Sequence, residues 1–184
     1  MPPIPLPDPE LRDDVVRLRA PHREDVEAIH AACQDPLIQH YTFVPVPYEP
    51  EHARTWVDSA AALRQAGDTL SLVVTRAGGD ELQGTVGLLR PDWVHRSAEI
   101  GYWTAPAARG QGLTWRAVRL LARWAIPAVD LARVTCQVDT GNAASQRVAE
   151  KAGFVREGVL RSAIEAKGRR WSLVVHSLIA EDLA

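Results

Sequence analysis

The chain has 184 residues, of which 46% are hydrophobic and 24% charged, and its 21 basic and 23 acidic side chains give a formal net charge of −2. This size suits one globular domain with a core large enough to fold unaided, and the near-neutral charge argues against nucleic acid as a partner. The two cysteines, Cys33 and Cys136, form no Cys-x-x-Cys pair, so we expect a reducing compartment, two buried thiols and no metal.

The N-terminal segment MPPIPLPDPELRDD has neither the basic end nor the apolar run of a signal peptide. Its prolines predict an extended arm over residues 1–14, outside a single domain formed by residues 15–184. No apolar stretch in the sequence is long enough to span a membrane. We therefore expect a cytoplasmic protein with no membrane partner.

The first elements of the domain are predicted to be a strand and two helices. Val15–Ala20 alternates as a half-buried strand does, and a helix follows from Pro21 to about Gln34. Segment 35–50, DPLIQHYTFVPVPYEP, is too rich in proline for regular structure and too aromatic for a solvated linker. We expect a packed loop there, which either walls a pocket or covers core. A second helix is predicted over 50–66.

Three apolar, β-branched runs follow at Thr69–Arg76, Gln83–Arg90 and Ser97–Thr104. The first two are joined by Ala-Gly-Gly-Asp-Glu, which is a hairpin signal, and the connector before the third run is short. Three consecutive antiparallel strands are therefore expected.

The stretch Arg109–Thr114, RGQGLT, lies between the third of these strands and a long amphipathic helix that ends near Ala128. Two glycines beside a helix start let the backbone approach a ligand closely, and the first-turn N–H groups point outward at an anion. The loop lacks the Lys-Ser/Thr of a P-loop and the third glycine of a dinucleotide turn. Gly-x-Gly before a helix is also a common way for the chain to turn, so the loop alone does not establish that a ligand binds.

The last third of the chain adds a parallel strand. Arg133–Val138 alternates again, and the helix before it makes a strand, helix, strand unit. Asn142 is predicted to cap a short helix ending at Lys151, and the runs 155–160 and 171–179 predict a hairpin. The expected fold class is α/β, with a mixed sheet that is antiparallel at its N-terminal strands, parallel near the glycine loop and flanked by helices.

This ordered set resembles the GNAT superfamily of N-acyltransferases over nearly the whole chain, from about Val15 to Ala180. The glycine loop is similar to the acyl-CoA pyrophosphate loop of that family, Gln/Arg-x-x-Gly-x-Gly/Ala. Its sixth position is Thr114 instead, whose hydroxyl could donate to a phosphate or crowd it. The branch of ribosomal-protein N-terminal acetyltransferases is the most similar. That resemblance rests on the runs AEIGYWTAPAARGQGL, RAVRLLARWA and NAASQRVAEKAGFVREGVLR, and on Pro47-Tyr48 followed by Ala53 and Trp56.

The resemblance implies an N-acyltransferase that moves an acyl group, most simply from acetyl-CoA, directly onto a primary amine in a ternary complex. The acceptor would be a protein or peptide N-terminus or a small-molecule amine. The alternative is a GNAT-like domain that binds acyl-CoA or a partner protein with little catalysis. A homodimer is also expected, because relatives often form dimers and six tryptophans exceed what a small core hides. The implied acyl-CoA contacts are Trp103, Thr104, Ala105, Arg109, Gly110, Gln111, Gly112, Leu113, Thr114, Asn142 and Ser145.

Acyl transfer to an amine needs a base or a water chain that removes a proton, because an α-amino group with a pKa of about 8 is mostly protonated at neutral pH. Glu99 is the first candidate. It shares a strand face with Trp103, and similar enzymes often place a carboxylate beside the thioester. An ion pair across the sheet would account for Glu99 equally well, with its partner being Arg17, Arg19 or Arg96.

The resemblance gives two further catalytic candidates. Glu165 in the last hairpin is a second possible base, although the position that matches the carboxylate of relatives is Ile164. Many GNAT enzymes protonate the leaving thiolate with a tyrosine, but Ala149 stands at that position here. Ser145, one helical turn after Asn142, is the substitute that closer relatives suggest. The alternative is a serine that merely satisfies the first helical turn.

Overall fold

The computed structural model describes residues 1–183. One mixed sheet of eight strands has the order β1-β2-β3-β4-β5-β6-β8-β7, which confirms the α/β prediction. The strands are β1 (Leu11–Arg12), β2 (Val16–Arg19), β3 (Thr69–Arg76), β4 (Gly84–Asp92), β5 (Ser97–Thr104), β6 (Arg133–Asp139), β7 (Val155–Ala166) and β8 (Arg169–Ile179). The helices are α1 (Val26–Ala32), α2 (Pro36–Tyr41), α3 (Pro50–Ala66), α4 (Leu113–Ala128) and α5 (Ala143–Lys151), and short 3₁₀ turns cover Arg23–Asp25, Pro106–Ala108 and Ala180–Leu183.

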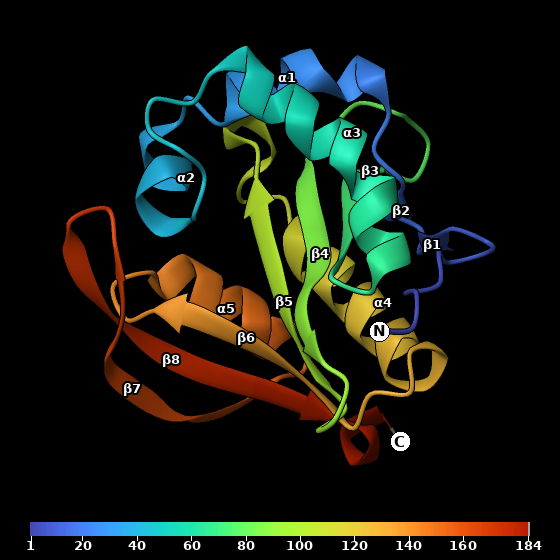
Figure 1. The fold of residues 1–184 in the computed structure, drawn as a ribbon, viewed down its shortest axis with the longest axis vertical. Helices are drawn as coiled ribbons and strands as arrows, with labels where there is room; N and C mark the ends of the chain where they lie inside the picture. Colours follow the sequence, from blue (N-terminus) through green and yellow to red (C-terminus); the bar gives the residue numbers. More distant parts are fainter. Residues whose placement is uncertain (184) are drawn as a thin grey trace.

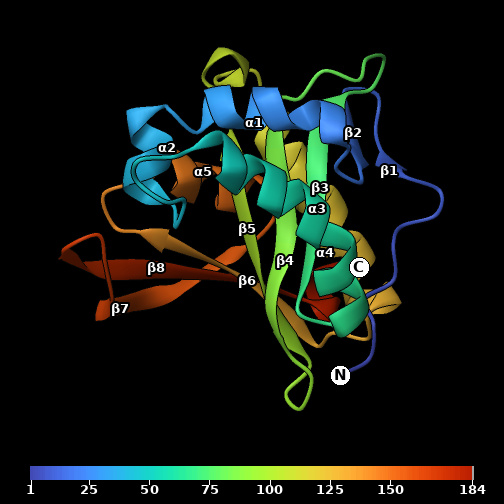
Figure 2. The ribbon, with the colours of Figure 1, turned by 45° about the horizontal axis from the view of Figure 1, so that its top comes forward.

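Helices cover both faces of the sheet (Figures 1 and 2). The main core cluster lies between the sheet and α4, with Leu72 of β3 and Leu121 of α4 among its members. The second cluster lies on the other face under α1 and α3, and includes Val73 and Ile29. Because successive side chains of a strand point to opposite faces, neighbours on β3 serve different clusters. No helix within residues 1–183 is long and apolar enough to cross a bilayer.

The strands β5 and β6 separate along their length. They pair in parallel over only three positions, from Ser97 with Arg133 to Glu99 with Thr135. Beyond Glu99, β5 stays paired with β4 and β6 stays paired with β8, so the two strands diverge (Figure 1). Backbone N–H and C=O groups along the gap lose their strand partners, and buried groups of this kind need others. The gap is therefore a place where the sheet can bind an extended ligand.

Segment 35–50 is only partly the irregular loop that its prolines predict. Asp35 begins α2 by accepting two backbone N–H groups of that helix, each at 3.0 Å, and Pro36 occupies the first turn. The expectation of a loop without regular structure is wrong for 36–41. Asp before Pro is typical of a helix start as well as of a turn. The carboxylate accepts the N–H groups of the first helical turn, and proline has no N–H that would need an acceptor there.

The N-terminal arm is extended, but it does not lie outside the fold. Ile4 is fully buried in the main core cluster. Its backbone N–H donates to the carbonyl of Arg64 at 3.0 Å, and the Arg64 guanidinium donates to the Ile4 carbonyl at 2.8 Å. One apolar side chain between prolines is thus enough to hold the arm beside the end of α3. The division of the chain after residue 14 stays a prediction.

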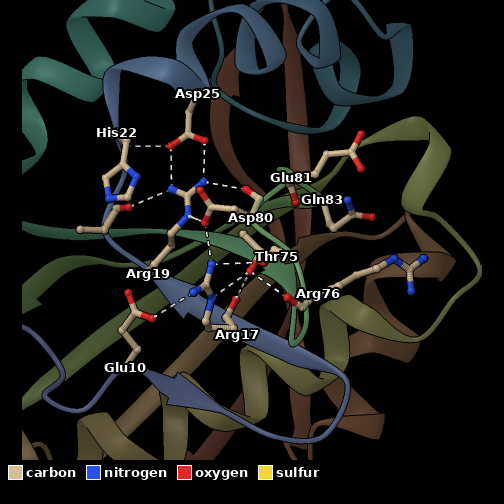
Figure 3. A network of polar contacts seen from close by, with 12 residues as sticks. Glu10, Arg17, Arg19, His22, Asp25, Thr75, Arg76, Asp80, Glu81 and Gln83 are labelled. Carbon is tan, nitrogen blue, oxygen red and sulfur yellow. Dashed lines mark hydrogen bonds and ion pairs between the residues drawn. The ribbon is translucent and has the colours of Figure 1, made fainter.

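A polar network fixes the turn between β2 and α1 (Figure 3). Arg19, which is 3% exposed, donates to both carboxylate oxygens of Asp25 at 2.8 Å and to Asp80 at 2.6 Å. Burial raises the pKa of Asp25, but the Arg19 guanidinium and the backbone N–H of His22 together more than offset this, so that pKa lies below its usual range. Arg17 also binds Asp80, at 2.5 Å. Both arginines are therefore engaged far from Glu99.

Candidate active site

The diverging strands open into a cleft of about 1500 Å³. It is lined by β4, β5 and β6, by α2 and α3, by the glycine loop and by the start of α5. Contacts bridge its two walls: Tyr41 donates to the carbonyl of Gly141 at 3.3 Å, and Phe43 stacks on Trp171 with ring centroids 5.7 Å apart. Segment 35–50 therefore walls a pocket, which is the first of its two predicted roles.

The glycine loop presents backbone to this cleft. Gly110 and Gly112 line it and have φ values of 74° and 76°, in the left-handed region that favours glycine. A Cβ at Gly110 would meet nothing within 4 Å, and one at Gly112 would meet the indole nitrogen of Trp115 at 3.1 Å. Backbone conformation, more than crowding, therefore calls for glycine. Gly112 is also the N-cap of α4, whose first-turn N–H groups have no intrahelical partners.

Several loop side chains are engaged within the protein. Arg109 donates to Asp35 at 2.6 Å, which lowers the pKa of that carboxyl group and joins the loop to the start of α2. Gln111 donates to a backbone carbonyl at 2.7 Å, and the Leu113 side chain is buried in the core. For Gln111 and Leu113, only the backbone remains as a contact for a ligand in the cleft.

The departure from the family pattern at Thr114 has a structural role. Its hydroxyl oxygen lies 2.5 Å from that of Thr104, so the two side chains tie the first turn of α4 to the end of β5. The sequence left open whether this hydroxyl donates to a phosphate or crowds it. In the structure it is hydrogen-bonded to the Thr104 side chain. A glycine or alanine at this position would lack that contact.

The backbone of β5 faces two ways along the predicted contact region. The N–H of Ala105 donates to the carbonyl of Gln83 at 2.9 Å, on the β4 side. Because N–H groups alternate between the two sides of a strand, the N–H of Trp103 also points to β4, while those of Tyr102 and Thr104 point into the gap. Of the expected backbone contacts at 103–105, only Thr104 is open to a ligand, and Tyr102 joins it.

Glu99 lies at the point of divergence, with its side chain 13% exposed and lining the cleft. Burial raises its pKa above the usual value, although Arg90, which forms an ion pair with it, acts in the opposite direction. A carboxylate of raised pKa in a cleft suits a general base. The alternative of an ion pair across the sheet is therefore present as well, but its expected partners are wrong, because Glu99 pairs with Arg90 of β4 instead of Arg17, Arg19 or Arg96. Arg90 has a φ of 48° at an irregularity in β4, which regular strand register does not predict.

Glu165 is not brought together with the other candidates. Its side chain is 68% exposed and pairs with Arg170 at 3.5 Å, whereas Ile164 lines the cleft. Adjacent residues of a strand point to opposite faces, so the offset of one residue turns the carboxylate away from the cleft.

The start of α5 holds the remaining candidates. The Asn142 side chain accepts the backbone N–H of Ser145 at 3.0 Å, which confirms the predicted cap. The Ser145 hydroxyl oxygen lies 2.8 Å from that of Tyr102, which also donates to the Ser145 carbonyl at 3.0 Å. Sequence reasoning missed Tyr102, since only the packing of α5 beside β5 brings these residues together. Glu99 and Tyr102 lie on opposite faces of β5, so the gap has a carboxylate on one side and a pair of hydroxyls on the other.

The charged lining of the cleft is mostly basic. Within residues 1–183, two acidic residues line the cleft, and each pairs with an arginine. Glu99 pairs with Arg90, and Asp139 lies 3.0 Å from Arg169. Arg147 and Lys151 on α5 also line the cleft, and sequence reasoning missed both because charges on a helix usually mark a solvated face. This surplus of cations suits a ligand that carries phosphates.

Residues 16–155 match the acetyltransferase (GNAT) domain family. Among curated proteins, the chain is 30% identical to the uncharacterized N-acetyltransferase YoaA of Bacillus subtilis (strain 168), covering 93% of this chain and 97% of YoaA. It is 32% identical to the ribosomal-protein-serine acetyltransferase of Escherichia coli (strain K12), covering 61% of this chain and 62% of that one. The solved structure of Mycobacterium smegmatis RimJ in complex with CoA-disulfide gives a TM-score of 0.81 at 25% identity, covering 91% of this chain and 83% of RimJ.

Proposed function

The chain belongs to the GNAT acetyltransferase family, and from this premise we propose that it transfers the acetyl group of acetyl-CoA to the α-amino group of a protein or peptide. One observation carries the proposal. The gap between β5 and β6 has the mostly buried Glu99 on one face and the hydroxyls of Tyr102 and Ser145 on the other. A base and a thiolate partner on opposite sides of one reacting centre are what acyl transfer from a thioester to an amine requires.

Acetyl-CoA would bind through the backbone of the glycine loop and of β5. The N–H groups at Gly110, Gly112 and the first turn of α4 suit the pyrophosphate, and the basic side chains of α5 suit the phosphates further along the cleft. The gap-facing groups of Tyr102 and Thr104 suit the amide-bearing pantetheine arm. The complex of RimJ with CoA-disulfide supports this cosubstrate.

The reaction assigns separate tasks to the two sides of the gap. Glu99 takes the proton that the attacking amine loses, and its raised pKa brings it closer to the pKa of about 8 of an α-amino group than an exposed glutamate would be. Backbone N–H groups that face the gap donate to the carbonyl oxygen as negative charge develops on it. Ser145 donates a hydrogen bond to the departing sulfur.

The charges of the cleft support an acceptor with a single amine. A polyamine keeps a second cation after one nitrogen has been deprotonated, and both acidic residues that line the cleft in the described chain are already paired with arginines. A peptide N-terminus brings no obligatory second charge. The similarity to the ribosomal-protein-serine acetyltransferase supports the same acceptor class.

The cellular setting and the oligomeric state belong to the same proposal. The free thiols of Cys33 and Cys136 are both buried, which supports the reducing environment of the cytoplasm. Exposed apolar side chains on the edge strand β7, at Val155, Val159 and Leu160, support association into a homodimer.

An acceptor panel tests the function. Release of CoA from acetyl-CoA would be measured with a peptide that has a free N-terminus and a lysine, with the same peptide blocked at its N-terminus, and with a polyamine. We expect release with the free peptide only, and mass spectrometry should find the acetyl group on its α-nitrogen. Release with the blocked peptide or the polyamine alone would refute the acceptor class. Binding of acetyl-CoA without release for any acceptor would favour the alternative, a binding domain without useful catalysis.

A further inference from the structure

We infer that the hydroxyl of Tyr102 orients the Ser145 side chain so that its proton points at the sulfur of the leaving group. Tyr102 is then a positioning residue that acts through Ser145. The inference rests on the proposed function, because it needs a thiolate beside Ser145. It assigns a task to Tyr102, which is neither part of the glycine loop nor the proposed base.

The contacts of Ser145 allow two arrangements of its hydroxyl proton. Its backbone N–H is held by Asn142 at 3.0 Å, and its carbonyl accepts the Tyr102 hydroxyl at 3.0 Å. Its hydroxyl oxygen lies 2.8 Å from the Tyr102 oxygen, and each of these two groups carries a single proton. With the Tyr102 proton on the Ser145 carbonyl, the serine proton can point at the Tyr102 oxygen. With the Tyr102 proton on the Ser145 hydroxyl oxygen, the serine proton needs a different acceptor. Ser145 lines the cleft, and a thiolate there favours this second arrangement because it accepts the serine proton.

Tyr102 is suited to act as a lasting donor. Its ring packs against the main core cluster, and burial raises the pKa of its hydroxyl above the usual value, so it stays protonated. Both oxygens within its reach belong to Ser145. Because β5 fixes the tyrosine backbone and α5 fixes the serine backbone, the pair couples the strand that binds the thioester to the helix that supplies the donor.

The chemistry involves no proton transfer through Tyr102. The amine forms the C–N bond and gives its proton to Glu99, and the C–S bond breaks with its electron pair staying on sulfur. Ser145 donates a hydrogen bond to this thiolate and keeps its own proton. When CoA leaves, the thiolate takes up a proton from solvent and Glu99 releases the one it took from the amine, which restores the site. The hydrogen bond from Tyr102 polarises the serine hydroxyl and so makes it a stronger donor.

A double-mutant cycle separates positioning from a general structural role. The variants are Tyr102→Phe, which removes one oxygen, Ser145→Ala, and the two combined. We expect Tyr102→Phe to lower kcat about three- to tenfold, as the loss of one neutral hydrogen bond would, and Ser145→Ala to lower it about ten- to a thousandfold. Acetyl-CoA affinity should stay within about twofold, since the sulfur carries charge only late in the reaction.

The double variant decides the question. If Tyr102 acts through Ser145, the combined kcat should match that of Ser145→Ala within about twofold. Full kcat in Tyr102→Phe, or independent losses that multiply in the double variant, would overturn the inference. A wild-type protein that releases no CoA with any acceptor would instead refute the proposed function.

A fluorinated tyrosine at position 102 keeps the test valid if Tyr102→Phe does not fold. It preserves the shape of the ring while making its hydroxyl a stronger donor. We expect kcat to change in the wild-type background and to stay unchanged in the Ser145→Ala background. An unchanged kcat in both backgrounds would also overturn the inference.

Discussion

Replacing Gly112 by aspartate tests the role of the glycine loop. This residue lines the cleft, begins α4 and has a φ of 76°. The substitution adds a side chain and a negative charge at the place where the pyrophosphate is proposed to bind. We expect acetyl-CoA to bind much more weakly to Gly112→Asp, although the protein remains folded.

The size of the effect follows from two terms. A non-glycine residue in the left-handed region costs about 1–2 kcal/mol, which lowers stability but not necessarily affinity. Two unit charges about 4 Å apart interact by about 4 kcal/mol at an effective dielectric constant of about 20, and by half of that at twice the distance. Repulsion of about 2–4 kcal/mol raises the Kd about thirty- to seven-hundredfold. The carboxylate also favours the helix N-terminus by about 0.3–1 kcal/mol, which offsets part of the strain.

Isothermal titration calorimetry measures this Kd directly, and Gly112→Asn is the matched control. Asparagine has nearly the shape of aspartate and tolerates the left-handed region, but it carries no charge. The asparagine variant should therefore keep most of the affinity that the aspartate variant loses. Equal affinities for acetyl-CoA in the wild type and in a folded Gly112→Asp would refute the placement of the pyrophosphate at this loop.

Three further predictions concern the base, the fold and the assembly. Glu99→Gln should lower kcat/KM about a hundredfold or more and remove the rising limb of its pH profile, which the raised pKa of Glu99 places above that of an ordinary glutamate; an unchanged limb would assign the base elsewhere. Asp25→Ala should lower the free energy of unfolding by about 3–5 kcal/mol, because it leaves Arg19 buried without that partner. Folding lowers the pKa of Asp25, so the stability that Asp25 contributes is present above its ordinary pKa of 3.8 and is lost as the pH falls through the folded value. In urea titrations, the free energies of unfolding of wild type and variant should therefore converge in acid. Sedimentation should find a dimer at about tens of micromolar, as a standard-sized interface would give, and a monomer there would contradict the proposed homodimer.

Local signals in the sequence suffice for the parts of the site that lie within one element. The strand 97–104, the two glycines with α4 behind them and the cap at Asn142 all follow from short patterns with known geometry. Because each pattern fixes the backbone of its own residues, these three elements agree with the structure within a few residues. The parallel pairing of β5 with β6 follows from the helix between them.

Contacts between distant residues could not be predicted in the same way. Tyr102 and Ser145 are 43 positions apart, and their hydrogen bond depends on how α5 packs against β5. The pairing of Glu99 with Arg90 depends on an irregular stretch of β4, where a φ of 48° breaks the alternation of side chains. The homodimer expected from the six tryptophans stays a prediction, because the structure describes one chain, in which Trp171 is buried and the other five are half-buried.

A crystal structure of the protein with acetyl-CoA would show directly where the cosubstrate binds. The proposed binding mode places the pyrophosphate on the N–H groups of the glycine loop and the pantetheine arm in the gap between β5 and β6. The sulfur should lie within hydrogen-bonding reach, about 3.5 Å, of the Ser145 hydroxyl, with Glu99 on the opposite side of the thioester carbonyl. A cosubstrate bound outside the gap, or a thioester turned away from both Ser145 and Glu99, would contradict it.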